Sequence, residues 1–211
     1  SSSSAASDVY KRQQSYNPLT NKTLKKMAEN VTKVTKDILP DQKLDCVAYG
    51  CTSGTIASGY KSICKKINIA KPNTKVTTPI TSAINAFKTL KINKLSIFTP
   101  YTNEINQSLI NYFKNKNIAI DELFYLDIAS DLDIGKVDPN YLFDVLTKKN
   151  LSQSNVLFIS CTALPVLSIL QDLENKLGKV ILSSNQTLIW DTLRQIKYKS
   201  KIKGFGELFK N

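Results

Sequence analysis

The sequence predicts an α/β fold with parallel sheets flanked by helices, arranged in two lobes. Strand-like segments alternate with helical patterns almost without interruption, and right-handed crossovers between such strands give parallel sheets with helices on their faces. One motif also occurs twice: an apolar run that ends in Cys-Thr, at Leu44–Thr52 and at Asn155–Thr162, each followed by a helical pattern. The repeat indicates two related halves.

The first part of the chain offers few strands. Apolar residues between Leu19 and Leu39 recur at three- and four-residue steps and Pro40 closes the run, which predicts one amphipathic helix over residues 17–40. The segments expected after it are a buried strand, a helix, a short extended piece and another helix, at Leu44–Gly50, Gly54–Ile69, Val76–Thr77 and Ile80–Leu90.

The second part of the chain predicts a fuller sheet. Four strands are expected, at Lys94–Thr99, Ala119–Leu126, Val156–Ser160 and Lys179–Ser183. The helices between and after them are expected at Glu104–Asn115, Pro139–Lys149, Leu164–Leu177 and Gln186–Ile196. Gly178 is expected to cap the third of these helices, and the Ser183–Gln186 segment to cap the last. Because the first lobe has so few strands, we expect it to be incomplete.

The expected division of the chain follows from these patterns. Residues 1–13 show no apolar periodicity and are expected to be a non-native scar. Residues 14–80 form the incomplete first lobe, which the C-terminal segment 186–211 completes, and residues 81–185 form the second lobe.

Composition limits the class of protein. With 211 residues, 42% hydrophobic and 22% charged, the chain can bury a sizeable core, and no apolar run approaches the roughly 20 residues that cross a bilayer. We therefore expect a cytoplasmic protein without a membrane partner. The net charge of +12 comes from scattered lysines without an arginine and aromatic stripe, so we expect no nucleic-acid partner, although a positive field attracts anionic substrates.

The reactive residue types are equally limited. The chain has no histidine, which excludes Ser-His and Cys-His catalytic pairs and zinc sites that need imidazole. Its four cysteines do not form a secreted disulfide framework, so reduced thiols are expected. Cys46 falls in mid-strand and Cys64 in mid-helix, where packing is the expected role.

Cys51 and Cys161 are different, because each follows a strand and precedes a helical pattern. Unpaired N–H groups and the positive end of a helix favour a thiolate at such a place. We expect the two lobes to present one sulfur each to a shared cleft, with the Thr52 and Ser53 hydroxyls receiving a carboxylate. The alternative for each cysteine is a small buried residue at a strand end.

Two further junctions offer polar side chains. Phe98–Asn103 places Tyr101 at the tip of a strand, where its hydroxyl donates to an anionic substrate or its ring packs as part of a lid. Ser183–Gln186 is a helix cap first and a ligand contact second.

Four segments, taken in order, resemble the maleate isomerase and arylmalonate decarboxylase branch of the aspartate/glutamate racemase superfamily. They are Ala48–Thr55, Phe98–Asn103, Phe158–Thr162 and Ser183–Trp190, and the likeness extends from about residue 16 to the end of the chain. The resemblance implies two pseudo-symmetric Rossmann-like lobes with the substrate between them, no metal and no organic cofactor. It also implies that Cys51 is the nucleophile or base, Cys161 the opposing acid or base, and Tyr101, Thr52, Ser53 and Thr162 the substrate-binding residues.

The function that the resemblance implies is a cofactor-independent isomerase or racemase of a small carboxylic or dicarboxylic acid, similar to maleate cis-trans isomerase. Decarboxylases of this branch keep only the second-lobe cysteine, so the presence of both cysteines favours isomerase or racemase chemistry. The alternatives are an arylmalonate decarboxylase-like lyase and a non-catalytic homologue that binds a small anion. A homodimer is compatible with the sequence. The family's first strand and its amide-bearing loop have no counterpart here, and Asp131 falls where the isomerases carry a second carboxylate-binding amide, which favours a substrate other than maleate.

Overall fold

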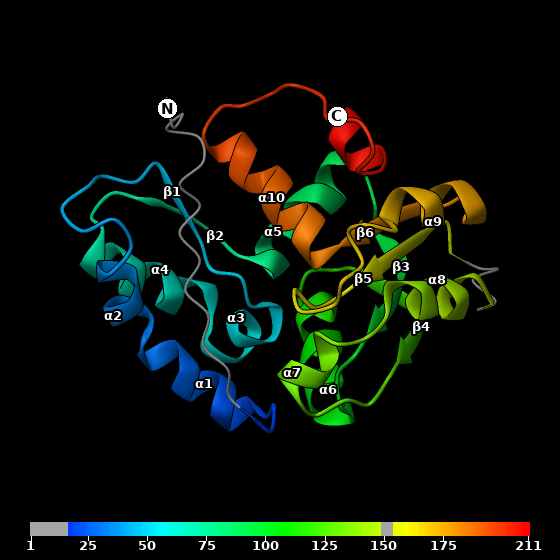
Figure 1. Cartoon of the computed structure of the whole chain (residues 1–211), viewed down its shortest axis with the longest axis horizontal. Coiled ribbons are helices and arrows are strands. Elements are labelled where there is room, and N and C mark those ends of the chain that lie inside the picture. The colour runs from blue at the N-terminus through cyan, green and yellow to red at the C-terminus, as the bar shows by residue number, and fades with distance from the viewer. Residues whose placement is uncertain (1–16, 149–153) are drawn as a thin grey trace.

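The computed structural model describes residues 17–148 and 154–211 and shows two parallel sheets flanked by helices (Figure 1). A two-stranded sheet pairs β1 (Cys46–Ala48) with β2 (Lys75–Thr77). The larger sheet has the order β4-β3-β5-β6, with strands at Lys94–Thr99 (β3), Ala119–Tyr125 (β4), Val156–Ile159 (β5) and Val180–Ser183 (β6). The predicted α/β class and the four strands of the second half are confirmed. The expected scar at residues 1–13 lies outside the described residues.

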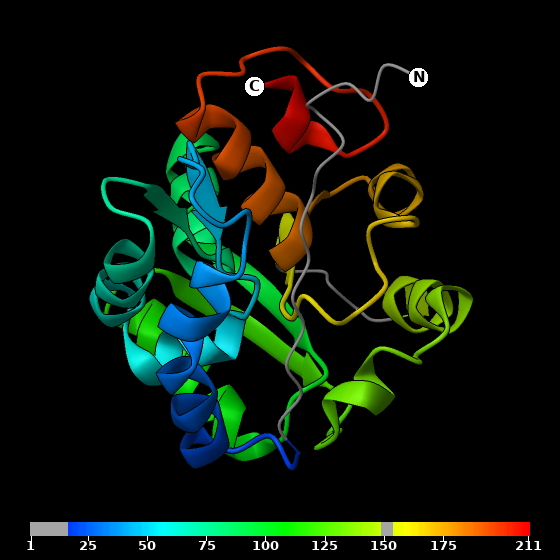
Figure 2. The same cartoon turned by 60° about the vertical axis from the view of Figure 1, so that its left-hand side comes forward.

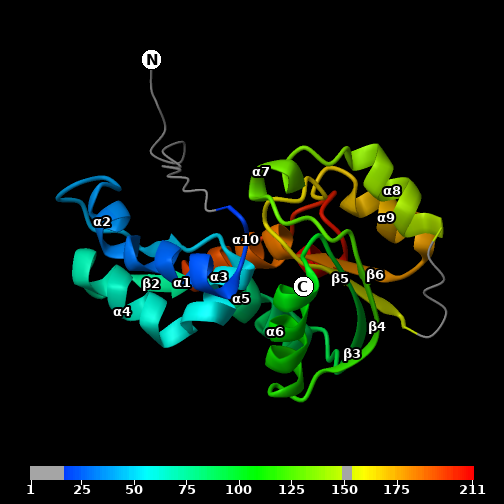
Figure 3. The same cartoon turned by 90° about the horizontal axis from the view of Figure 1, so that it is seen from below.

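Helices cover both faces of the larger sheet. Figure 3 shows α6 (Asn103–Lys114) on one face, and α8 (Pro139–Lys148) with α9 (Leu170–Leu177) on the other. Successive side chains of β5 therefore point to opposite faces of the sheet. Leu157 and Ile159 join the cluster that includes residues of α8 and α9, whereas Phe158 packs edge-on against Phe87 with ring centroids 5.5 Å apart. The sheet is therefore buried on both faces, as parallel sheets are.

One helix links the two sheets. α10 (Ser184–Gln195) packs along α5 (Pro79–Thr89) and also contacts β1, β2 and β6 (Figure 2). Its first turn is fixed by a capping box, in which the Ser183 hydroxyl accepts from the Gln186 N–H and the Gln186 side chain accepts from the Ser183 N–H, so the predicted cap is confirmed. The division into lobes at residues 80 and 186 remains a prediction.

Two expected helices are interrupted in the structure. The single helix expected over residues 17–40 is wrong, since α1 (Asn21–Glu29) ends at Asn30 and α2 (Val31–Lys36) begins there. The helix expected at Gly54–Ile69 is likewise two helices, α3 (Thr52–Ser58) and α4 (Tyr60–Ala70). Gly59 separates them with φ +80°, a conformation that glycine adopts without steric cost.

Other boundaries also differ from expectation. The strand expected at Leu44–Gly50 is limited to β1, and α9 begins at Leu170 rather than at Leu164. Gly178 caps α9 in a left-handed conformation, as predicted. The one-turn helix α7 (Asp131–Ile134) and the 3₁₀ turn η1 (Glu207–Lys210) were not expected. Within the described residues, no helix combines the length and the apolar character that a bilayer crossing requires.

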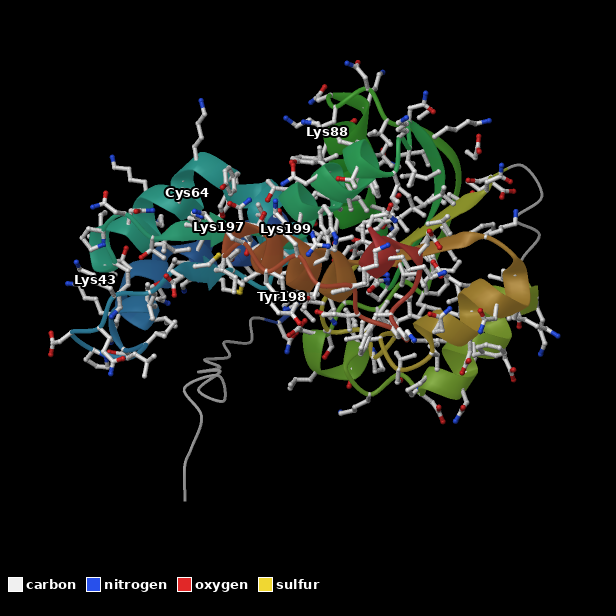
Figure 4. All side chains as sticks on the ribbon, turned by 90° about the horizontal axis from the view of Figure 1, so that it is seen from above. Lys43, Cys64, Lys88, Lys197, Tyr198 and Lys199 are labelled. Atoms are coloured by element: carbon white, nitrogen blue, oxygen red, sulfur yellow. The ribbon has the colours of Figure 1, made fainter. Side chains whose placement is uncertain are left out.

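The lysines responsible for the net charge belong to separate elements. Figure 4 labels Lys43 before β1, Lys88 in α5, and Lys197 and Lys199 after α10. The basic charge is therefore contributed from several parts of the fold rather than from one helix.

Lys71, the C-cap of α4, fastens the loop that leads into β1. The residue is 6% exposed, and its ammonium donates to the carbonyl oxygens of Leu39 and Gln42 at 2.7 and 3.0 Å. Lys71→Met is expected to reduce the free energy of unfolding by about 1–3 kcal/mol, because both carbonyls lose their donor. Urea denaturation measures the change, and Lys65→Met, on the exposed face of α4, is the control. Equal stability of the two variants would contradict the role given to Lys71.

Candidate active site

Cys51 is the N-cap of α3, where its backbone is extended and its Sγ accepts a hydrogen bond from the Gly54 N–H at 3.2 Å. The Ser53 hydroxyl lies 3.8 Å from the same sulfur. Thr52 and Ser53, the two residues expected to receive a carboxylate, begin this helix and are both buried. The predicted placement of Cys51 beside a helix N-terminus is confirmed.

Cys161 has a different setting from the one expected, since no helix follows it directly. Its backbone has φ +111°, an uncommon and strained conformation for a residue with a side chain. The Ala163 N–H approaches its Sγ at 3.4 Å, and the side chain is 6% exposed. Pro165 lacks an N–H and α9 starts only at Leu170, so loop N–H groups take the place of a helix end.

Ser184 joins the two cysteine segments. Its fully buried hydroxyl accepts from the Cys161 N–H at 3.0 Å and shares a 2.9 Å hydrogen bond with the Thr52 hydroxyl. Thr52 and Ser184 are 132 positions apart in the chain, yet both are the first residues of helices, α3 and α10. The sequence predicted a helix cap and a secondary ligand contact for this segment, and nothing in its pattern identified Ser184 as the link.

Thr162 makes a second connection between the same segments. Its hydroxyl donates to the Gly50 carbonyl at 2.7 Å, and the Asn185 side-chain amide donates to the Thr162 carbonyl at 2.9 Å. The end of β1, the segment after β5 and the start of α10 are therefore tied together. The structure thus ties the Cys51 and Cys161 segments together, and the arrangement of the two sulfurs on one shared cleft remains a prediction.

Tyr101 lies at the same place, 2% exposed and packed in the core cluster that contains Cys161. Burial and the neighbouring Cys161 thiol raise the pKa of its phenol well above the usual value, so it stays protonated and is a hydrogen-bond donor. The segment is held locally, because the Asn106 side chain donates to the Tyr101 carbonyl at 3.1 Å and accepts from the Thr99 hydroxyl at 2.6 Å.

The thiols are protonated more firmly than the sequence predicts. Burial raises the pKa of Cys51, against the lowering effect of the Gly54 N–H and Ser53 hydroxyl. Burial also raises the pKa of Cys161 to about 12. The expectation that the strand-end position alone favours thiolate is therefore wrong, because removing the sulfur from water outweighs the N–H groups that face it.

Asp131, the first residue of α7, contributes negative charge to the same place. Its carboxylate raises the pKa of both Cys51 and Cys161, and partial burial raises the pKa of Asp131 itself. The segment is held by the Asp131 N–H, which donates to the Asn17 side chain at 2.9 Å. Asp131 therefore lies near the two cysteines, as the sequence predicted, and its partial burial disfavours the charged carboxylate.

Cys46 in β1 and Cys64 in α4 are half-buried in other parts of the fold. Two cavities of ≈420 and ≈310 Å³ also lie away from the cysteine pair: the larger is next to Lys71, and the smaller is between α9 and η1. In residues 17–148 and 154–211, no group of three or more His, Cys, Asp or Glu side chains is placed to hold a metal ion.

The connection through Ser184 predicts unequal effects of two substitutions. Ser184→Ala leaves the buried Cys161 N–H without its acceptor and is expected to destabilise the protein by about 1–3 kcal/mol. Thr52→Val removes only the hydroxyl–hydroxyl bond and leaves the Cys161 N–H paired, so its cost is expected to be smaller. Urea denaturation of the two variants decides the matter, and an equal or larger loss in Thr52→Val would refute this account.

Comparison with known proteins identifies the family of this chain. The family model described as arylmalonate decarboxylase matches residues 17–209. A maleate isomerase of Geobacillus stearothermophilus is 26% identical over 200 residues, which are 90% of this chain and 78% of the relative.

Two solved structures show the same fold. The maleate isomerase Iso from Pseudomonas putida superimposes with a TM-score of 0.84 at 18% identity, over 94% of this chain and 82% of that one. A mutant of the Nocardia farcinica maleate cis-trans isomerase with a covalently bound succinylcysteine intermediate has a TM-score of 0.81 at 16% identity, over 89% and 80% of the two chains. Since the family model spans most of the sequence, this chain belongs to the arylmalonate decarboxylase family.

Proposed function

We propose that the protein is a cofactor-independent cis-trans isomerase of a small unsaturated dicarboxylic acid, with maleate as the substrate to test first. The observation that carries the proposal is the convergence of the Cys51 and Cys161 segments on the Ser184 hydroxyl. Relatives named maleate isomerase, and a related structure that holds a succinylcysteine, support the choice of reaction.

In the proposed reaction the Cys51 thiolate adds to one alkene carbon of maleate and forms an S–C bond. The electron pair of the double bond moves to the other carbon, where the adjacent carboxylate delocalises it and the Cys161 thiol supplies a proton. The bond between the two carbons is now single and rotates. Cys161 then removes a proton from the same carbon, the double bond reforms as fumarate, and the sulfur of Cys51 leaves as thiolate.

The remaining polar groups are proposed to bind the substrate. Tyr101 is a protonated phenol and donates to a carboxylate. When Ser184 donates to Thr52, the Thr52 hydroxyl keeps its own proton for a second donation. Ser53 supplies a further hydroxyl beside Cys51. Thr162 is also proposed to bind the substrate, and because its hydroxyl donates to the Gly50 carbonyl, donation to a carboxylate requires that this hydrogen bond be exchanged.

The proposed setting follows from the same chemistry. Both sulfurs act as free thiols, which a reducing compartment such as the cytoplasm maintains. The substrate is a small carboxylate that the positive charge of the chain attracts. We propose no nucleic-acid partner, and the lysines labelled in Figure 4 come from several elements.

Proton NMR of the full chain with maleate in deuterium oxide tests the proposal. Fumarate is expected to appear with its own vinyl signal. Parallel samples with aspartate, glutamate and substituted malonates report the alternatives, since a racemase exchanges the α-proton and a decarboxylase gives the shortened acid. A folded protein that leaves maleate unchanged would overturn the proposed reaction.

A further inference from the structure

Tyr49 has a buried hydroxyl with no hydrogen-bond partner among the described residues. The residue follows β1, and its backbone is fixed because the Tyr49 N–H donates to the Thr77 carbonyl and the Tyr49 carbonyl accepts from the Cys51 N–H, both at 2.9 Å. A buried polar group without a partner is costly, so such a group at a candidate site calls for a functional explanation.

The Tyr49 hydroxyl and the Cys51 sulfur both lie next to the backbone of Gly54. A methyl group at Gly54 would lie 2.8 Å from Cys51 Sγ and 2.8 Å from Tyr49 Oη, so these two atoms are within about 5.6 Å of each other. The missing side chain of Gly54 is therefore what leaves room for the sulfur and the hydroxyl side by side. The phenol and the thiol also interact electrostatically, since Cys51 contributes to raising the pKa of Tyr49.

The Cys51 sulfur needs a further donor in order to ionise. Burial raises the pKa of Cys51, and the Gly54 N–H and the Ser53 hydroxyl offset this effect only in part. Burial also raises the pKa of the Tyr49 phenol far above neutrality, so the phenol keeps its proton while the thiol loses its own. A neutral donor that is already buried stabilises a thiolate without the entropy cost of ordering water.

We propose that the Tyr49 hydroxyl donates a hydrogen bond to Cys51 Sγ when this sulfur carries negative charge, and so increases the nucleophilicity available at neutral pH. The hydroxyl has no competing partner among the described residues, and its oxygen lies within about 5.6 Å of the sulfur, so the proposal requires the phenol ring to move toward Cys51. This inference rests on the proposed function for its purpose. Ionisation of Cys51, however, can be measured without any substrate.

The experiment follows alkylation of Cys51 by iodoacetamide over a range of pH, with peptide mass spectrometry reporting each cysteine separately. In Tyr49→Phe the Cys51 rate is expected to be about tenfold lower at pH 7, and its pH midpoint to be higher, because a hydrogen bond to a charged acceptor is lost. Alkylation of Cys64 in the same samples is expected to be unchanged. Tyr141→Phe, which alters an exposed tyrosine, is the matched control.

Thermal melting distinguishes this role from a structural one. Because the substitution removes an unpaired hydroxyl, Tyr49→Phe is expected to melt at the same temperature as the unaltered protein or higher. Tyr49→Leu also removes the hydroxyl, and its Cys51 midpoint is expected to rise in the same way. If folded Tyr49→Phe has an unchanged pH midpoint of Cys51 alkylation, the proposal is overturned. This holds even if the KM for maleate increases in the same variant. Loss of maleate turnover in the unaltered protein would instead refute the proposed reaction alone.

Discussion

Cys51→Ser is expected to reduce maleate isomerisation by about a thousandfold or more, as removal of a covalent nucleophile does. A serine hydroxyl in this position has the same Gly54 N–H and Ser53 hydroxyl beside it, but it does not ionise near neutral pH. The S–C bond on which rotation depends therefore does not form. Rates of fumarate production, followed by proton NMR, measure the loss.

The chain contains matched controls for this substitution. Cys46→Ser and Cys64→Ser make the same chemical change at half-buried cysteines in β1 and α4. Both are expected to keep the rate of the unaltered protein, because these sulfurs are not joined to the Ser184 connection. Full turnover by Cys51→Ser, or equal losses in all three variants, would exclude Cys51 as the nucleophile.

The order of strands and helices could be predicted because it depends on local periodicity. The continuous apolar run of β5 and the three- and four-residue steps of α6 each report burial against neighbouring elements, and the structure has both. The interruptions could not be predicted in this way. Gly59 ends α3 through its positive φ, whereas Asn30 separates α1 from α2 while its backbone stays in the right-handed helical region, and the apolar pattern continues across both positions.

The candidate site shows the same difference. The two Cys-Thr motifs could be found because each marks the end of a strand, the place at which α/β folds bind their ligands, although β1 and β5 belong to different sheets. Ser184 and Tyr49 could not be assigned, since their roles depend on contacts with atoms that only folding brings close. The charge state of the thiols was also mispredicted, because the depth of burial is not a local property of the motif.

Cys161→Ser is expected to have a different consequence, the accumulation of a covalent adduct on Cys51. In this variant the nucleophile and its donors are intact, so addition to maleate continues, and solvent protonates the carbanion slowly. The serine hydroxyl is a poor acid and base at this step, so removal of the proton from the adduct is expected to slow by about 10²–10⁴-fold. Intact-protein mass spectrometry would then show a gain equal to one molecule of maleic acid.

The position of this adduct on the chain, and whether it forms at all, distinguish the two reactions that a cysteine pair can catalyse: addition followed by rotation, and two-base proton transfer. Peptide mapping is expected to place the added mass on Cys51, and the double variant Cys51→Ser, Cys161→Ser is expected to show none. Addition followed by rotation requires such an adduct, whereas two-base proton transfer moves hydrogen between the sulfurs without an S–C bond. A Cys161→Ser protein that exchanges substrate protons but never gains mass would therefore replace isomerisation with racemase chemistry at the same pair.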